Sequence, residues 1–318
     1  FLVKYKSKKN KTKKMDTNEI KIIGIGGAGN NVMRAILSRN IKNVDCIVCN
    51  TDVQSLLLGK GQSHHKLQIG AETTKGKGTD RNVELGKLSV IESKKQIEQL
   101  FDKNSKTAIF IAGLGGGTGT GATPMMSKIA KDKGLFTIAI VHMPFTFESE
   151  NTHEIANEGI TELQKLADYT FVIHNDKIRK AYGNLSFKAG FGKLDSMIAQ
   201  LLKMLISSGN TNDLKALTEK TQQGESVFIG FGESQGKFRQ RKAIEEALKN
   251  ALSDRVDIYG VKNIFVHICY GNTKVTIDEM DDIKAAVLQN AGNGANIIIS
   301  VEEDLVINDS LSIGVLAS

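Results

Sequence analysis

The sequence has few of the residues that cross-link or kink a chain, with three cysteines and two prolines among 318 residues, and it has no tryptophan. Three cysteines are too few for a disulfide framework, which indicates a protein of a reducing, cytoplasmic compartment. Cys46 and Cys49 form a C-x-x-C pair, but they lie in a predicted strand, where positions i and i+3 point to opposite faces. The six histidines show no metal-binding spacing, so the sequence predicts no transition-metal site.

Long apolar runs and a generally basic composition are also missing. No run approaches the roughly 20 apolar residues that a membrane-spanning helix needs, and the opening FLV is too short for a signal peptide. The net charge of +7 comes from residues 1–14, FLVKYKSKKNKTKK, which hold seven lysines and no acid. The rest of the chain is balanced in charge, so we expect no nucleic-acid partner. Residues 1–18 are predicted to be a disordered tail, with a membrane- or nucleic-acid-binding arm as the alternative, and Met15 is a candidate natural start.

Apolar runs alternate with amphipathic stretches over the first half of the chain. Strands are predicted at 20–25, 44–49, 107–112, 136–141 and 169–174, and helices at 28–39, 82–100, 119–132 and 153–167. This order is typical of an α/β fold in which helices cover both faces of a Rossmann-like parallel sheet. A long helix with a broad apolar stripe is predicted to follow at 188–207.

The pattern changes after a polar, turn-rich segment at 208–226. Strands are predicted at 226–231, 263–269, 295–301 and 311–317, and helices at 239–252 and 277–290. Because the last two strands are close in the chain, we expect them to form a hairpin in a mixed sheet. The predicted organisation is a tail (1–18), a nucleotide-binding domain (19–185), a central helix (186–208) and a smaller α+β C-terminal domain (209–318).

Two glycine-rich loops carry the predicted chemistry. In the first, GIGGAGNN (24–31), Gly24, Gly26 and Gly29 form a G-x-G-x-x-G between a strand and a helix. Such glycines let a phosphate approach the backbone at a helix N-terminus. Taken alone, this loop indicates an NAD(P)-type site, with Asp45 or Asp52 as the acid that binds a ribose.

The second loop, GGGTGTGA (115–122), changes that interpretation. It also follows a predicted strand and opens a helix, and Thr118 and Thr120 add hydroxyls for capping or for phosphate oxygens. Gly116 is expected either to face a phosphate or to adopt a positive φ. Since both loops leave the carboxyl edge of one parallel sheet, two helix N-termini would converge on one polyphosphate. A P-loop lysine is missing, so backbone groups and a metal ion would hold a triphosphate.

These residues resemble the tubulin superfamily, whose signature is GGGTGTGA, and within it the FtsZ family of bacterial cell-division GTPases. GIGGAGNN is similar to that family's first phosphate loop, NTDVQSL (50–56) to the second and ETTKGKGTDRNVELG (72–86) to the third. PFTFE (144–148) resembles the ribose loop, NDK (175–177) the sixth loop and FKAGFGKLD (187–195) the start of the central helix. The resemblance covers residues 20–318 and implies the tubulin/FtsZ fold.

The resemblance also implies residue roles toward GTP or GDP, with Mg²⁺ bound through the nucleotide and no protein metal ligands. Gly115, Gly116, Gly117, Thr118, Gly119 and Thr120 would hold phosphates, and Gly26, Gly27 and Asn30, with Asn50, Asp52 and Gly76, would line the other side. Glu148 would contact the ribose, Asn175 and Asp195 the guanine, and Phe191 would stack on the base. Asp195 is four residues beyond Phe191, which independently places both on one helix face.

Two departures from the family pattern concern hydrolysis. The family uses a loop of the form N-x-D-x-x-D, but no register of GNTNDLKALTEK (209–220) supplies both acids. Alignment on Asn210 places Asn212 and Lys215 at the acidic positions, and a shift by one places Asp213 and Ala216 there. Asp213 is therefore the one predicted catalytic residue, and two carboxylates would normally place and polarise the water. Thr152 occupies the position of an arginine that contacts the nucleotide, and the neighbouring His153 would only partly replace it.

We therefore expect a cytoplasmic GTP-binding protein that acts at the division site. It would assemble with itself head-to-tail into filaments and hydrolyse GTP weakly at the subunit interface. The alternatives are a divergent member that co-assembles and hardly hydrolyses GTP, and an NAD(P)-dependent oxidoreductase that uses the first loop alone. The linker and tail through which the family binds membrane-anchoring and other cell-division proteins are not in this sequence.

Overall fold

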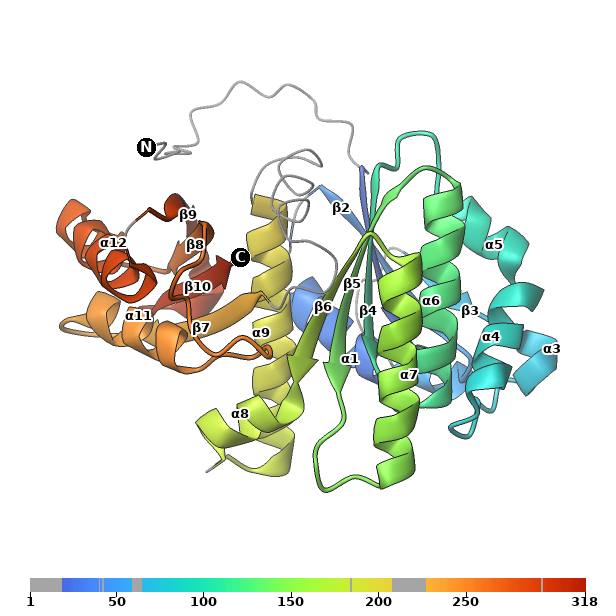
Figure 1. Cartoon of the computed structure of the whole chain (residues 1–318). Helices are drawn as coiled ribbons and strands as arrows, with labels where there is room; N and C mark the ends of the chain where they lie inside the picture. The colour runs from blue at the N-terminus through green and yellow to red at the C-terminus, as the bar shows by residue number, and fades with distance from the viewer. Residues whose placement is uncertain are drawn as a thin grey trace. The chain divides into compact units, whose positions relative to one another are not determined.

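The computed structural model describes residues 19–39, 41, 43–58, 65–183, 185–207, 227–292 and 294–318 (Figure 1). The described chain divides into two compact units. The N-terminal unit runs to Asp176 and also includes Phe187–Ala199, and the C-terminal unit comprises Lys177–Ser186 and Gln200–Ser318.

The N-terminal unit is built on a six-stranded sheet in the order β3-β2-β1-β4-β5-β6, in which every pairing is parallel. Its strands are β1 (Ile20–Ile25), β2 (Val44–Asn50), β3 (His65–Gln68), β4 (Thr107–Gly113), β5 (Phe136–Met143) and β6 (Tyr169–His174). β1 and β5 are buried along their whole length, as expected for strands covered on both faces. The predicted parallel α/β sheet is confirmed, and β3 is a short strand that the apolar pattern did not indicate.

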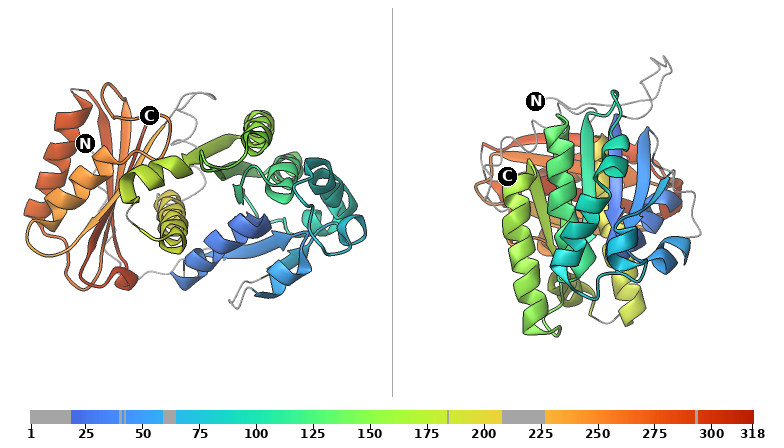
Figure 2. Two further views of the ribbon diagram at one scale, coloured as in Figure 1. Left: turned by 90° about the horizontal axis from the view of Figure 1, so that it is seen from below. Right: turned by 90° about the vertical axis from the view of Figure 1, so that its right-hand side faces the viewer.

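Helices follow the strands on both faces of this sheet (Figure 2). They are α1 (Gly26–Ser38), α2 (Val53–Leu58), α3 (Ala71–Thr74), α4 (Val83–Glu92), α5 (Lys94–Gln99), α6 (Gly117–Asp132) and α7 (Glu150–Leu166). The next helices in the chain, α8 (Asn175–Tyr182) and α9 (Phe187–Ser207), are each divided between the two units. The single helix predicted over 82–100 is wrong, because α4 and α5 are separate. Ser93 lies at the break, where its Oγ accepts a hydrogen bond from the Gly70 backbone nitrogen at 2.9 Å.

The C-terminal unit has a mixed sheet in the order β7-β10-β8-β9. Its elements are β7 (Phe228–Ser234), α11 (Arg239–Lys249), β8 (Asn263–Tyr270), α12 (Ile277–Ala291), β9 (Asn296–Glu303), the 3₁₀ helix η1 (Leu305–Ile307) and β10 (Leu311–Ala317). The mixed sheet is confirmed, but the predicted hairpin is wrong. β9 pairs in parallel with β8, while β10 pairs antiparallel with both β7 and β8. All seven residues of β10 are buried and β9 is largely half-exposed, which suits a central and an edge position respectively.

Candidate nucleotide-binding site

The two glycine loops meet at the point where the strand order of the sheet changes direction. β1 and β4 are neighbours, and the connections that carry α1 and α6 lead from them toward opposite edges of the sheet. Right-handed crossovers then place α1 and α6 on opposite faces, leaving a crevice between their N-termini. A Cβ atom added to Gly26 would lie 3.4 Å from the backbone nitrogen of Gly119 and 3.6 Å from Cβ of Thr118. The predicted convergence of the two loops is therefore present in the fold.

Neither helix N-terminus is capped by a side chain. The N-cap residues of α1 and α6 are Ile25 and Gly116, and neither makes a side-chain cap hydrogen bond. The first N–H groups of each helix consequently lack the partner that a Ser, Thr or Asp cap would supply. Cβ atoms built on Gly27 and Gly116 would meet no atom within 4 Å, so both glycines border open space. This arrangement fits an anion that the backbone itself would bind.

The glycines of the second loop have different structural roles. Gly116 has φ −100°, so the suggestion that it needs a positive φ is wrong. That conformation belongs to Gly115, at φ +96°, where an added Cβ would also lie 2.6 Å from Cγ2 of Thr152. Cβ atoms on Gly117, Gly119 and Gly121 would lie 2.4, 2.2 and 2.2 Å from backbone oxygens of Asn82, Gly113 and Val83. These three glycines let α6 pack closely against the α4 segment and the end of β4.

Three threonine hydroxyls join the surrounding loops. Thr118 Oγ1 lies 2.7 Å from Thr51 Oγ1 and 3.1 Å from Thr79 Oγ1, so the 50–56 and 72–86 segments meet the glycine-rich loop. Thr120, in contrast, is 2% exposed, and its Oγ1 accepts from the Gly115 backbone nitrogen at 2.9 Å. Thr120 therefore shapes the loop from inside, whereas Thr118 lies at its partly exposed surface.

Asn30 and Asn50 hold the first glycine loop in shape. With its amide oriented to suit its neighbours, Asn30 donates to the carbonyls of Gly24 and Gly26 at 3.0 and 3.2 Å, and its oxygen accepts from Asn50 Nδ2 at 3.3 Å. Asn50 Oδ1 also accepts from the Asp52 backbone nitrogen at 3.2 Å. The two amides therefore stabilise the turn that contains Gly27, which borders open space.

Asp52 and Gly76 shape the neighbouring loop. The Asp52 carboxylate caps α2, accepting from Ser55 Oγ and the Gln54 backbone nitrogen, both at 2.8 Å. The Ser55 hydroxyl is the largest cause that lowers the pKa of Asp52 below its ordinary value. Gly76 has φ +70°, and a Cβ there would lie 2.9 Å from Cγ2 of Val53. Both residues shape the backbone of this loop, and the Asp52 carboxylate is engaged within the protein.

The base side of the site gathers at the ends of β5 and β6. Glu148 Oε1 accepts from the Phe145 backbone nitrogen at 2.9 Å, which closes the 144–148 loop. Thr146 donates from its backbone nitrogen and hydroxyl to the Asp176 carboxylate at 2.9 and 3.0 Å, tying this loop to the start of α8. The rings of Phe145 and Phe191 meet edge to face, 5.3 Å apart, which joins the loop to α9. Glu148 and Phe191, which are far apart in the sequence, are therefore linked through Phe145 on the same side of the candidate site.

Asp195 lies one helical turn beyond Phe191. Burial raises the pKa of its carboxyl to about 6, and the positive charge of Arg34 in α1 opposes that rise. A hydrogen bond of 2.6 Å from Arg39 Nη2 to Ser196 Oγ also joins α1 to α9. At neutral pH Asp195 is mostly a carboxylate, a pure hydrogen-bond acceptor in a partly desolvated setting.

Asn175 is the first residue of α8 and is 2% exposed. Its neighbour His142 was not among the site residues predicted from the sequence. His142, near the end of β5, is 7% exposed, and burial lowers its pKa to about 4, an effect that Asn175 partly opposes. A polar residue ending the apolar run FTIAIV was the available signal.

The residues at the position of the family's arginine make local contacts. Thr152 is 4% exposed, and its hydroxyl lies 2.8 Å from that of Ser149, the N-cap residue of α7. His153 Nε2 lies 3.0 Å from the Phe145 backbone oxygen. Asp213 and the 209–220 loop lie outside the described residues.

Within the described ranges of the chain, no cluster of three or more His, Cys, Asp or Glu side chains is arranged to hold a metal ion. None of the helices that the structure describes is both long and apolar enough to span a bilayer.

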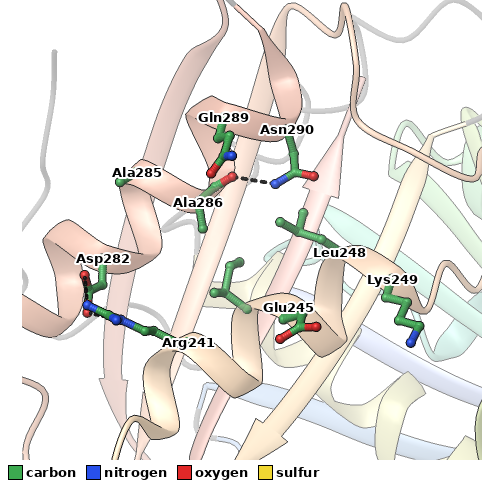
Figure 3. Close-up of a pocket in the computed structure, with 10 residues that line it drawn as sticks. Arg241, Glu245, Leu248, Lys249, Asp282, Ala285, Ala286, Gln289 and Asn290 are labelled. Atoms are coloured by element: carbon green, nitrogen blue, oxygen red, sulfur yellow. Dashed lines mark hydrogen bonds and ion pairs between the residues drawn. The ribbon is translucent and has the colours of Figure 1, made fainter.

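A separate hollow of about 450 Å³ lies between α11 and α12 in the C-terminal unit (Figure 3). The Arg241–Asp282 ion pair, 3.0 Å from Nε to Oδ2, lies at one end, and Leu248 and Ala286 contribute apolar lining. None of the predicted nucleotide-site residues lines it.

Comparison with known proteins finds a family match in each unit. Residues 19–183 match the family described as Tubulin/FtsZ family, GTPase domain, and residues 225–318 match the FtsZ family, C-terminal domain. The cell division protein FtsZ of Buchnera aphidicola subsp. Schizaphis graminum is 32% identical over 305 residues, covering 94% of this chain and 78% of that protein. This chain belongs to the FtsZ family.

Solved structures of related proteins show the same fold. The empty FtsZ dimer of M. jannaschii has a TM-score of 0.84 at 28% identity, covering 96% of this chain and 89% of that one. CetZ2 from Haloferax volcanii, solved as a GTPγS-bound protofilament, has a TM-score of 0.72 at 18% identity, covering 94% and 92% of the two chains, and shows the fold alone. The tubulin/FtsZ fold that the family resemblance implies is confirmed, and the chain is a member of a GTPase family of cell-division proteins.

Proposed function

We propose that this chain binds GTP between the N-termini of α1 and α6 and assembles head-to-tail into filaments at the division site. One observation carries the proposal: two helix N-termini without a side-chain cap lie close together, with a Cβ on Gly26 placed 3.4 Å from the Gly119 backbone nitrogen, and Gly27 and Gly116 both border open space. Each N-terminus offers free N–H groups and the positive end of a helix dipole. A triphosphate has enough negative charge to use both, whereas a single loop suffices for a dinucleotide diphosphate.

The phosphate side would work through backbone groups. N–H groups after Gly26 and Gly116 would donate to phosphate oxygens, and the Thr118 hydroxyl would donate to a further oxygen. Mg²⁺ entering with the nucleotide would neutralise charge on the phosphates. Thr51 and Thr79 would set the direction of the Thr118 hydroxyl, because both of their hydroxyls lie within 3.1 Å of it.

The base side would distinguish guanine from adenine. The Asp195 carboxylate would accept from the N1–H and 2-amino groups of guanine, and adenine lacks both donors. Asn175 would contribute an amide to the same base, and Phe191 would stack on it. Glu148 has one carboxylate oxygen engaged with the Phe145 backbone nitrogen, and the other would accept from a ribose hydroxyl.

Hydrolysis would be slow. The 209–220 loop provides Asp213 as its one acid before Glu219, so paired carboxylates would not place the attacking water. Thr152, at the position of the family's arginine, and the neighbouring His153 would not add a permanent positive charge near the phosphates. The chain would accordingly form long-lived filaments by itself, or co-assemble with a faster relative.

The nucleotide content of the purified full chain tests this proposal. Protein would be denatured, and the released small molecules separated and identified by mass. We expect GDP or GTP in a near-stoichiometric amount. A nicotinamide nucleotide, or a nucleotide-free protein that binds NAD(P)H and not GTP, would favour the oxidoreductase alternative instead. Sedimentation with GTP and with GDP would then test assembly, with pelleting expected for GTP.

A further inference from the structure

His142 lies where the phosphate side and the base side of the candidate site meet. A Cβ atom added to Gly113 would lie 2.8 Å from His142 Cε1, 2.9 Å from its Nε2 and 2.7 Å from Cβ of Ala28. The imidazole therefore packs against the end of β4 and beside the first turn of α1. Asn175, which opens α8 after the next strand, is its polar neighbour.

Two polar atoms of this pair are buried without a defined partner. Within the part of the chain that the structure describes, His142 Nδ1 and Asn175 Oδ1 make no hydrogen bond of good geometry, although their side chains are only 7% and 2% exposed. Unsatisfied buried polar atoms are costly, so each needs a partner in the working protein. Asn175 Oδ1 can only accept, and His142 Nδ1 can donate when it carries the proton. The two atoms are therefore complementary as hydrogen-bond donor and acceptor.

We propose that His142 is a positioning residue that orients Asn175 for nucleotide binding. In this arrangement the neutral imidazole carries its proton on Nδ1 and donates to Asn175 Oδ1. The Asn175 amide is then fixed with Nδ2 as a donor toward an acceptor atom on the base. This inference rests on the proposed GTP site, because Asn175 meets a nucleotide only there.

The protonation state of His142 suits a positioning role. Burial keeps its pKa near 4, so the ring is neutral over the whole physiological range and its hydrogen-bond pattern does not change with pH. A charged imidazolium would donate from both nitrogens and bring a buried positive charge to the site. The neutral ring instead fixes the orientation of Asn175 and adds no charge near the phosphates.

A double-mutant cycle on the full chain tests the inference. His142→Phe keeps a ring and removes both nitrogens, and Asn175→Ala removes the amide. GDP and ADP affinities of nucleotide-free parent, both single variants and the double variant would be measured by calorimetry. We expect His142→Phe to weaken GDP on the order of tenfold, about the effect of one buried hydrogen bond, and to have no further effect once Asn175 is alanine. Losses that simply add, or a His142→Phe variant that binds GDP as the parent does, would overturn it.

Controls separate positioning from general damage to the fold. Ser127→Ala removes a buried hydroxyl from α6, bonded to the Thr123 backbone oxygen at 2.9 Å, and should leave GDP affinity unchanged. His142→Gln retains a donor and should recover part of the lost affinity. If the parent itself binds no guanine nucleotide, the proposed function fails; if it binds and the cycle is additive, this inference alone fails. Nitrogen NMR of the histidine-labelled parent needs no variant: a neutral Nδ1–H tautomer at His142 is expected, and an Nε2–H tautomer would contradict the inference.

Discussion

A methyl group placed on Gly26 would lie 3.4 Å from the backbone nitrogen of Gly119, although the two residues belong to different strand–helix units. This approach is possible because α1 and α6 start from adjacent strands and lead to opposite faces of the sheet. Both helices lack a side-chain N-cap at this point. The fold thus brings two sets of free N–H groups together, and the proposed binding of GTP depends on that juxtaposition.

Gly116→Val should abolish GTP binding, and the variant should still fold and unfold cooperatively. Gly116 has an extended backbone that valine tolerates, and its side chain would enter the open space assigned to phosphate. Calorimetric titration and thermal unfolding would be measured on the same samples. Gly134→Ala is the matched control, because Gly134 also borders open space but has φ +82°. It should lose about 1 kcal/mol of stability and keep GTP affinity. Normal GTP binding by Gly116→Val would show that this space is not the phosphate site.

Gly121→Ala, in contrast, should lower the stability of the fold. Its Cβ would lie 2.2 Å from the Val83 backbone oxygen, so α6 and α4 would have to separate. Overpacking of this kind typically costs about 1–3 kcal/mol, which denaturant unfolding would detect. An unchanged free energy of unfolding would mean that the contact between the two helices relaxes without cost.

Asp195→Ala should weaken GTP binding by about 1.5–3 kcal/mol, the usual contribution of a hydrogen bond to a charged group. The preference for GTP over ATP should narrow by a similar factor, because ATP never used this carboxylate. Competition titrations with both nucleotides would measure this. Equal losses for GTP and ATP would indicate a general disturbance of α9 and remove Asp195 from base recognition.

Affinity for GDP should fall as the pH drops through about 6, where the Asp195 carboxyl gains its proton in the folded protein. The bound carboxylate accepts hydrogen bonds, so the nucleotide must displace that proton. Asp195→Asn is the control, because its remaining pH dependence comes from the phosphates and from other groups. Since the folded pKa is raised above 3.8, stability should also decrease as the pH rises from about 4 to 6, and this decrease should vanish in Asp195→Asn. Parallel pH profiles for the two proteins would contradict the role given to Asp195.

The parallel sheet and the convergence of the glycine loops could be predicted because each depends on local patterns plus a general rule of handedness. Buried strands such as β1 and β5 have a continuous apolar signal, and a parallel sheet directs every following loop to one edge. The approach of Gly26 to Gly119 follows from that geometry before any side chain is considered.

Pairing and backbone angles could not be obtained in the same way. β9 and β10 are close in sequence, but their order in the sheet depends on which strand fills the buried place between β7 and β8. Gly115 and Gly116 are equivalent as letters, and only the fold assigns the positive φ to Gly115. The role of His142 depends on Asn175 from another strand end, a contact that sequence spacing does not encode.

GTP turnover measured across a range of protein concentrations tests the account most directly, because turnover depends on nucleotide binding, on assembly and on Asp213 of the 209–220 loop. We expect turnover only above a threshold concentration. It should be slower than in a relative with both acids by a factor on the order of 10²–10⁴, the usual contribution of a positioned acid–base group. Asp213→Ala should reduce it further. Turnover that is independent of protein concentration, as fast as that of such a relative, or unaffected by Asp213→Ala would contradict the account.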